Sequence, residues 1–128
     1  MTNSSQIPAV NWPTESGEYR VVQLDLDSKT YLRFANDTHE SHYEVLRDIL
    51  SMVGIEYESV KSKRSTWDVA APEGPRYKVH GMGIAEVYPN NKRATFYGDS
   101  YDYGLTPDRE RLQKIAEQEP EWTFVFDF

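Results

Sequence analysis

Hydrophobic and polar residues alternate in the first part of the chain, which is the pattern of β-strands that bury one face. The alternation runs over residues 19–26, stops at the turn sequence Asp27-Ser28-Lys29, and resumes over residues 30–34. We predict two antiparallel strands joined by this turn. If the pairing is regular, one apolar face carries Val22, Leu24, Leu26, Leu32 and Phe34.

A helical spacing replaces the alternation after the second strand. Apolar residues recur every three or four positions between Tyr43 and Val53, and Gly54 suits a C-terminal cap. Two capping boxes compete for the start of this helix, Asp37-x-x-Glu40 and Ser41-x-x-Glu44. We therefore expect the helix to begin between residues 38 and 42.

The segment after this helix has the weakest pattern in the chain. Residues 55–60 fit a short strand, whereas residues 61–75 lack apolar periodicity and contain proline and glycine. We predict a strand followed by a mobile loop. The start of this loop holds the basic run Lys61–Arg64.

The last part of the chain predicts a hairpin, a helix and a closing strand. Residues 76–103 fit a long hairpin around the turn sequence Pro89-Asn90-Asn91. Thr106-Pro107-Asp108 combines a cap, an N1 proline and an acidic first turn, and Pro120 marks the helix end. Aromatic residues then alternate over residues 122–128, as expected for a strand.

These elements predict one α+β domain over residues 1–128, in which a mixed β-sheet is flanked by two α-helices. The order is ββα, then further strands, then αβ. The length suits a single hydrophobic core, and an aromatic fraction of 13% supplies large side chains for it. Residues 1–6 are polar and are expected to form a disordered tail.

Charge and composition exclude several classes of function. The chain has 14 basic and 21 acidic residues, so its net charge of −7 argues against nucleic-acid binding. It has no cysteine, which excludes disulfides and thiol nucleophiles. No apolar run approaches the roughly 20 residues that span a bilayer, and the polar N-terminus is unlike a signal peptide. We predict a cytoplasmic protein that does not enter a membrane.

Three histidines are the candidates for catalysis, His39, His42 and His80. His39 and His42 fall at the start of the first predicted helix, where backbone N–H groups favour anions and the helix dipole favours a neutral imidazole. This combination suits phosphoryl chemistry, although a histidine near a helix cap is more commonly a surface or capping residue. Two histidines without a third ligand make a weak metal site, so we predict neither a metal nor a cofactor.

Two further motifs are incomplete. Gly98-Asp99-Ser100 is similar to the nucleophile block of some esterases, but those enzymes need a later histidine and none follows His80. Gly81-x-Gly83 lacks the third glycine and the following helix of a dinucleotide-binding fingerprint. We predict neither activity.

Three blocks of sequence, taken in order, point to a known family. The first is Ile7-Pro8-Ala9-Val10 followed by the strand at 19–26, and the second is Glu40-Ser41-His42-Tyr43-Glu44-Val45. The third is Tyr97-Gly98-Asp99-Ser100-Tyr101-Asp102-Tyr103-Gly104, followed by a helix and an aromatic strand. Their order and spacing resemble the Janus/Ocnus family, which includes phosphohistidine phosphatases, over residues 7–64 and 95–128.

The resemblance implies metal-free removal of phosphate from phosphohistidine, on a phosphorylated protein or a small phosphoramidate. The family's essential histidine matches His42 by local motif, while an ungapped alignment back from Gly54 places it on His39. Arg33 also matches a family arginine, but a regular first hairpin would point it away from Arg20. The residues that match the family's phosphate-binding positions are Arg20, Arg64 and Ser100.

Two aspartates depart from the family pattern. Asp102 replaces a small alanine and Asp99 directly precedes Ser100, and carboxylates beside a phosphate would repel it. The leading prediction is a metal-independent phosphohydrolase with His42 as general base or nucleophile. The alternative is a non-catalytic member of the same fold that binds an anion or a protein partner. An active pocket should turn Asp99 and Asp102 outward, whereas a binding module need not.

Overall fold

The computed structural model describes residues 7–36, 39, 41–63 and 66–128. The predicted tail, the Asp37-x-x-Glu40 box and Arg64 lie outside the described residues. The elements are β1 Gly17–Leu26, β2 Lys29–Phe34, α1 His42–Met52, β3 Ser59–Lys61, β4 Asp68–Ala70, β5 Glu73–Gly74, β6 Tyr77–Tyr88, the 3-10 turn η2 Pro89–Asn91, β7 Arg93–Tyr97, α2 Arg109–Gln118 and β8 Thr123–Phe126.

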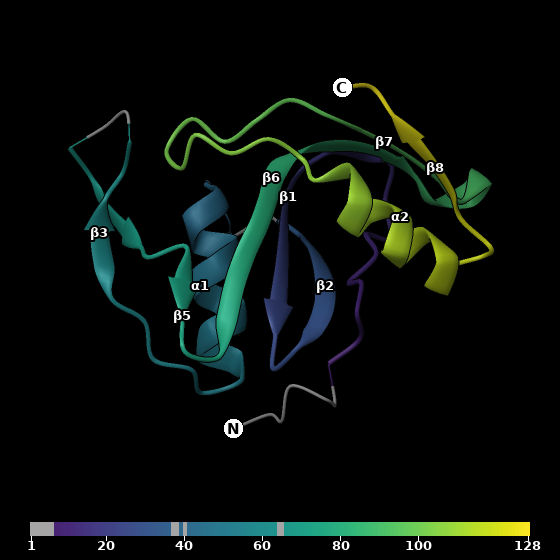
Figure 1. Ribbon diagram of the computed structural model, residues 1–128. Coiled ribbons are helices and arrows are strands. Elements are labelled where there is room, and N and C mark those ends of the chain that lie inside the picture. Colours follow the sequence, from purple (N-terminus) through teal and green to yellow (C-terminus); the bar gives the residue numbers. More distant parts are fainter. Residues whose placement is uncertain (1–6, 37–38, 40, 64–65) are drawn as a thin grey trace.

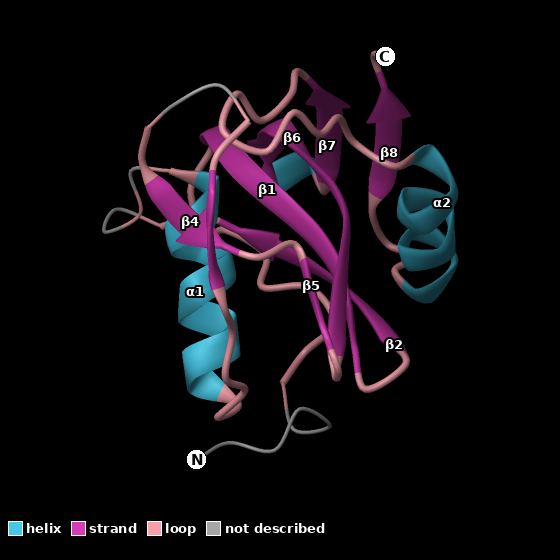
Figure 2. Cartoon of the chain, turned by 60° about the vertical axis from the view of Figure 1, so that its left-hand side comes forward, coloured by secondary structure: helices cyan, strands magenta, loops and turns pink. Residues whose placement is uncertain are grey.

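The main sheet is mixed and lies between the two helices. Its strands follow the order β2-β1-β6-β7-β8. The short β5 pairs with the first two residues of β6. β7 and β8 are parallel because α2 crosses over between them, and the other pairs in this sheet are antiparallel. α1 and α2 cover opposite faces of the sheet (Figures 1 and 2). The predicted α+β fold, a mixed sheet with two helices, is confirmed.

Each helix closes its own hydrophobic core. The apolar stripe of α1 packs on one face of the sheet, and the apolar stripe of α2 packs on the other. The α1 core includes Leu46 and Leu50 with Val22, Leu24 and Met82, and the α2 core includes Leu112 and Ile115 with Val21, Phe34 and Phe96.

The apolar face predicted for the first hairpin is wrong. The prediction assumed a three-residue turn, but the turn has two residues, Asp27 and Ser28, both at positive φ, and Leu26 pairs with Lys29. A shift of one residue reverses the direction of every side chain on β2. Val22, Leu24 and Leu26 therefore join the α1 core, whereas Leu32 and Phe34 join the α2 core.

Residues 55–75 hold more structure than predicted. Residues 55–58 are not a strand; β3 and β4 instead form a separate two-stranded ribbon, and β5 joins the main sheet. Val69 and Ala70 are buried, and the Ala71 N–H donates to the Glu58 carbonyl over 2.7 Å. The loop prediction is wrong because the apolar stretch at 69–71 was too short to show a period.

Two glycines allow the segment before α2 to lie directly on β6. A Cβ on Gly81 would lie 2.7 Å from the backbone nitrogen of Asp108, and a Cβ on Gly83 would lie 2.5 Å from Cγ of Pro107. Both distances are shorter than van der Waals contact. The buried side chain of Gln23 then bonds both the N–H and the carbonyl of Asp108, each over 2.9 Å.

The same contact moves the start of α2. The N-cap is Asp108, whose carboxylate accepts from the Arg111 N–H over 3.0 Å, and not Thr106 as predicted. Thr106 is unavailable because its carbonyl accepts from the Met82 N–H on β6 over 3.2 Å. The predicted hairpin of β6 and β7 around η2 is confirmed, but β7 ends at Tyr97 instead of residue 103.

Asp25 links β1 to β6 and α2. Its carboxylate lies 3.0 Å from Nε2 of His80 and 3.7 Å from a guanidinium nitrogen of Arg111, and it accepts a hydrogen bond from the Thr30 hydroxyl over 2.8 Å. Burial raises the pKa of Asp25. The hydrogen bonds from Thr30 and His80 and the positive charges of His80 and Arg111 outweigh burial, and the pKa falls below its ordinary value of 3.8.

Replacing Asp25 with asparagine should lower the free energy of unfolding at neutral pH by about 1 kcal/mol, since these partly solvated pairs lose their charge. A carboxyl group with a lowered pKa stabilises the fold above its unfolded-state pKa, and this contribution is lost as the pH falls through the folded-state value. The difference between wild type and Asp25→Asn should therefore close below about pH 3.8. Urea unfolding measures it, with exposed Glu117→Gln as control. A difference that persists unchanged in acid would contradict this role.

Candidate functional site

His42 is the first residue of α1, and its ring is buried against β6. The residue is 7% exposed, and its Nε2 lies 2.7 Å from the carbonyl oxygen of Gly83. This carbonyl lies beyond the last pair of the β6–β7 ladder, Ile84 with Tyr97. A carbonyl oxygen accepts but does not donate, so Nε2 carries a proton and Nδ1 holds the lone pair of the neutral ring. His42 is therefore not the surface residue that a histidine near a helix cap commonly is.

The imidazole of His42 is held in its neutral form. Burial is the largest cause and lowers its pKa below the ordinary value of 6.5. The hydrogen bond to Gly83 raises the pKa, the positive charge of Arg20 lowers it, and the negative charges of Asp102 and Asp99 raise it. Together these effects leave the pKa of His42 below its ordinary value. A neutral histidine was predicted from the helix dipole, but burial is the main cause here.

Arg20 lies on β1, on the face that α1 covers, and its side chain is exposed. Among the described residues its guanidinium forms no ion pair, so its charge is available to a ligand near His42. Arg33 also lies on this face, since it pairs with Val22. The prediction that Arg33 points away from Arg20 is therefore wrong. However, Arg33 is 8% exposed and donates to the carbonyl of Pro8 over 3.1 Å, so it is already engaged.

Ser100 is buried and stabilises the loop that follows β7. Its backbone N–H donates to the Leu105 carbonyl over 2.7 Å, and its hydroxyl accepts from the Tyr103 N–H over 3.4 Å. The loop carries Asp99 and Asp102 close enough to His42 for both carboxylates to affect its pKa. The two aspartates thus remain within electrostatic reach of the histidine.

His39 and His80 have other partners. Nδ1 of His39 accepts from the Asn36 N–H over 3.0 Å, and its Nε2 lies 3.4 Å from a carboxylate oxygen of Asp48 on α1. His80 belongs to the Asp25 cluster. Of the predicted site residues, Arg20 therefore lies within electrostatic reach of His42 beside the middle of β6, and Ser100 belongs to the loop that carries Asp99 and Asp102. His39 contacts Asn36 and Asp48, and Arg64 is outside the described residues.

Two features of the site were not predicted from the sequence. Ser41 is the N-cap of α1, but its side chain forms no capping hydrogen bond, so the Ser41-x-x-Glu44 box does not form. Its Oγ is buried without a hydrogen-bond partner in the described structure. The position of Ser41, directly before the histidine that starts the helix, could have indicated from the sequence that this serine belongs to the site. The Gly83 carbonyl had none, because its role depends on a contact between residues 41 positions apart.

Comparison with known proteins leaves the family open. A scan against protein-family models finds no match, and a search of curated proteins finds none either. In the part of the chain that the structure describes, neither helix has the length and apolar character to cross a membrane. The three sequence blocks therefore remain the support for the Janus/Ocnus resemblance.

The imidazole of His42 should titrate below pH 6.5, because its burial disfavours the charged form. The unfolded chain then binds this proton more readily, so stability should be complete above pH 6.5 and should fall as the pH drops through the folded-state value. His42→Gln, which keeps a donor for Gly83, should remove this part of the pH dependence. Histidine NMR resonances and urea unfolding measure both effects, with His39→Gln as control. A His42 resonance that titrates at or above pH 6.5 would contradict the assignment.

Proposed function

We propose that this protein is a metal-independent phosphohydrolase that acts on phosphohistidine or a similar phosphoramidate. The observation that supports it most directly is His42, a neutral imidazole oriented by a backbone carbonyl at the first residue of a helix. The charge of Arg20 lies within electrostatic reach of that ring. A base beside a cation is the combination that phosphoryl transfer requires.

In this proposal Nδ1 of His42 acts on water or on phosphorus. As a general base, Nδ1 accepts a proton while the water oxygen bonds to phosphorus; the P–N bond breaks and the leaving nitrogen takes up that proton. As a nucleophile, Nδ1 bonds to phosphorus as the P–N bond of the substrate breaks, and the leaving nitrogen takes up a proton from water. Hydroxide or a second water then bonds to phosphorus, the bond from phosphorus to Nδ1 breaks, and inorganic phosphate and the neutral imidazole of His42 are released. In both routes Arg20 and the Ser41 hydroxyl stabilise charge on the phosphoryl oxygens.

A second candidate function is a non-catalytic module that binds a ligand on the same surface. The observation in its favour is the pair Asp99 and Asp102, whose carboxylates act on His42 and would also repel a dianionic phosphoryl group. With Arg20 counted against them, the described charges nearest His42 sum to about −1. Such a site would bind phosphate weakly and would suit a ligand that also donates hydrogen bonds.

His42→Gln should reduce turnover of phosphohistidine by roughly a hundredfold to ten-thousandfold, because the variant keeps a hydrogen-bond donor but loses the basic nitrogen. His39→Gln is the matched control and should keep wild-type turnover, since both ring nitrogens of His39 have other partners, Asn36 and Asp48. Release of inorganic phosphate measures both. Absence of turnover in the wild type favours the binding module, and loss in His39→Gln alone would transfer the role to that residue.

Charge changes around His42 should act in opposite directions. Arg20→Ala should raise the KM for a phosphoramidate by roughly tenfold or more, because a charge-assisted contact is lost. Asp102→Asn should lower the KM, because repulsion of the phosphoryl group is removed while the backbone bond from Lys63 to the Asp102 carbonyl stays. Steady-state kinetics at low and high salt measure both shifts. Changes in the same direction would contradict this arrangement.

A further inference from the structure

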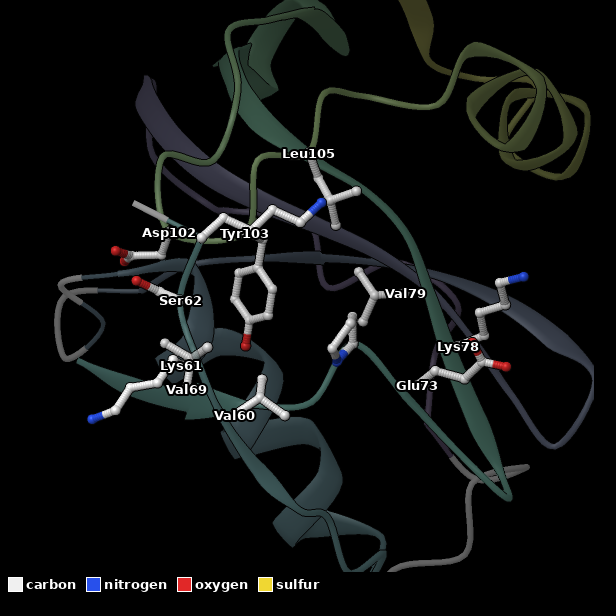
Figure 3. Close-up of a pocket in the computed structure, with 12 residues that line it drawn as sticks. Val60, Lys61, Ser62, Val69, Glu73, Lys78, Val79, Asp102, Tyr103 and Leu105 are labelled. Atoms are coloured by element: carbon white, nitrogen blue, oxygen red, sulfur yellow. The ribbon is translucent and has the colours of Figure 1, made fainter. Parts of the chain in front are cut away.

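A pocket of about 230 Å³ lies between the β3–β4 ribbon, the loop after β7 and β6 (Figure 3). Its walls are mainly apolar. Val60 and Val69 come from the ribbon, Val79 from β6, and Tyr103 and Leu105 from the loop. The ring of Tyr103 projects between the valines, and its hydroxyl donates to the Ala70 carbonyl over 2.8 Å, which fixes the ring in place (Figure 3).

Ser62 gives this pocket a polar group that lacks a partner. The residue is 8% exposed, and its Oγ is buried without a hydrogen bond in the described structure. It lies beside Asp102 at the edge of the pocket (Figure 3). Buried hydroxyl groups in proteins are nearly always hydrogen-bonded, because desolvation without a partner is unfavourable. A ligand that donates to or accepts from Ser62 would satisfy this group.

The segments that build the pocket also carry exposed apolar and aromatic residues. Val60, which lines the pocket, is 37% exposed, while Trp67 between β3 and β4 is 75% exposed and Tyr101 in the loop after β7 is 62% exposed. The ribbon and the loop are joined at the mouth, where the Lys63 N–H donates to the Asp102 carbonyl over 2.8 Å. Exposed tryptophan and tyrosine are enriched where proteins bind other proteins.

Charged side chains of both signs also line the pocket. Lys61 is paired with Asp68 over 3.1 Å, whereas the Lys63 ammonium forms no ion pair with any residue that the structure describes. Asp102 lines the pocket and also lies within electrostatic reach of His42.

We propose that this pocket receives an apolar side chain of a bound polypeptide, close in sequence to the residue that lies at His42. The pocket is smaller than the roughly 300–1,000 Å³ of sites for drug-sized molecules, which fits a single side chain. The neighbouring peptide group bonds to Ser62 Oγ. The inference rests on the proposed function for the phosphorylated residue, and it makes the substrate a polypeptide instead of a free phosphoramidate.

The test uses short glycine- and serine-based peptides that contain a hydrolysis-stable triazole analogue of phosphohistidine. A leucine is placed at each flanking position in turn, and the dissociation constant is measured by calorimetry. At one position the leucine should tighten binding by about tenfold or more, as expected for burial of an apolar side chain. Val60→Asp should abolish this gain, whereas Met52→Asp, at a residue of matched exposure (38%) on α1, should keep it.

Ser62→Ala separates binding from folding. The change removes an unsatisfied buried hydroxyl, so thermal stability should stay the same or rise, while the leucine peptide should bind several-fold more weakly. A gain from leucine at no position, or a gain that survives Val60→Asp, would overturn the proposal. Unchanged affinity in Ser62→Ala would contradict the role of its hydroxyl.

The same peptides without the phosphoryl group separate this inference from the proposed function. If leucine tightens binding and the phosphoryl group adds nothing, the pocket stands and the phosphohydrolase proposal fails. If the phosphoryl group tightens binding and leucine adds nothing, the pocket proposal fails and the proposed function stands.

Discussion

The close approach of residues 106–108 to β6 is the contact on which the rest of the structure depends. It requires glycine at positions 81 and 83, because a Cβ at either would lie within 2.7 Å of backbone or proline atoms. Gln23 then bonds both backbone groups of Asp108 and fixes the start of α2. The position of α2 closes one core and sets the crossover that makes β8 parallel to β7.

The same stretch of β6 serves the candidate site on the opposite side of the sheet. Gly83 leaves its carbonyl beyond the end of the β7 ladder, where His42 binds it. Burial against β6 lowers the pKa of His42. The packing that builds the fold therefore also keeps the His42 imidazole neutral. Under the proposed function, a structural and a chemical role meet at this histidine, and His42→Gln separates them better than a truncation does.

The region around the site combines opposing electrostatic features. Arg20 and Lys63 supply positive charge, while Asp99 and Asp102 lie near the same histidine. A site built for free phosphate would favour cations alone. In the proposed complex with a polypeptide, the carboxylates accept backbone N–H groups and the apolar pocket beside Asp102 receives a side chain.

The sequence by itself determined the elements whose patterns are long and local. The periods of β1, α1, α2 and β8 are visible because each buries one face over several residues, and the chain folds as predicted there. The blocks that make His42, Arg20 and Ser100 candidates are also short and local, and the function of these residues stays a prediction.

Tertiary structure decided what depends on register and on distant contacts. A turn of two residues instead of three moved Leu32 and Phe34 to the α2 core and Arg33 to the α1 face. The Gly83 carbonyl, the buried hydroxyls of Ser41 and Ser62, and the side-chain-sized pocket arise where separate segments meet. A local pattern cannot encode them, because the free energy of such contacts depends on packing between segments that are far apart in the chain.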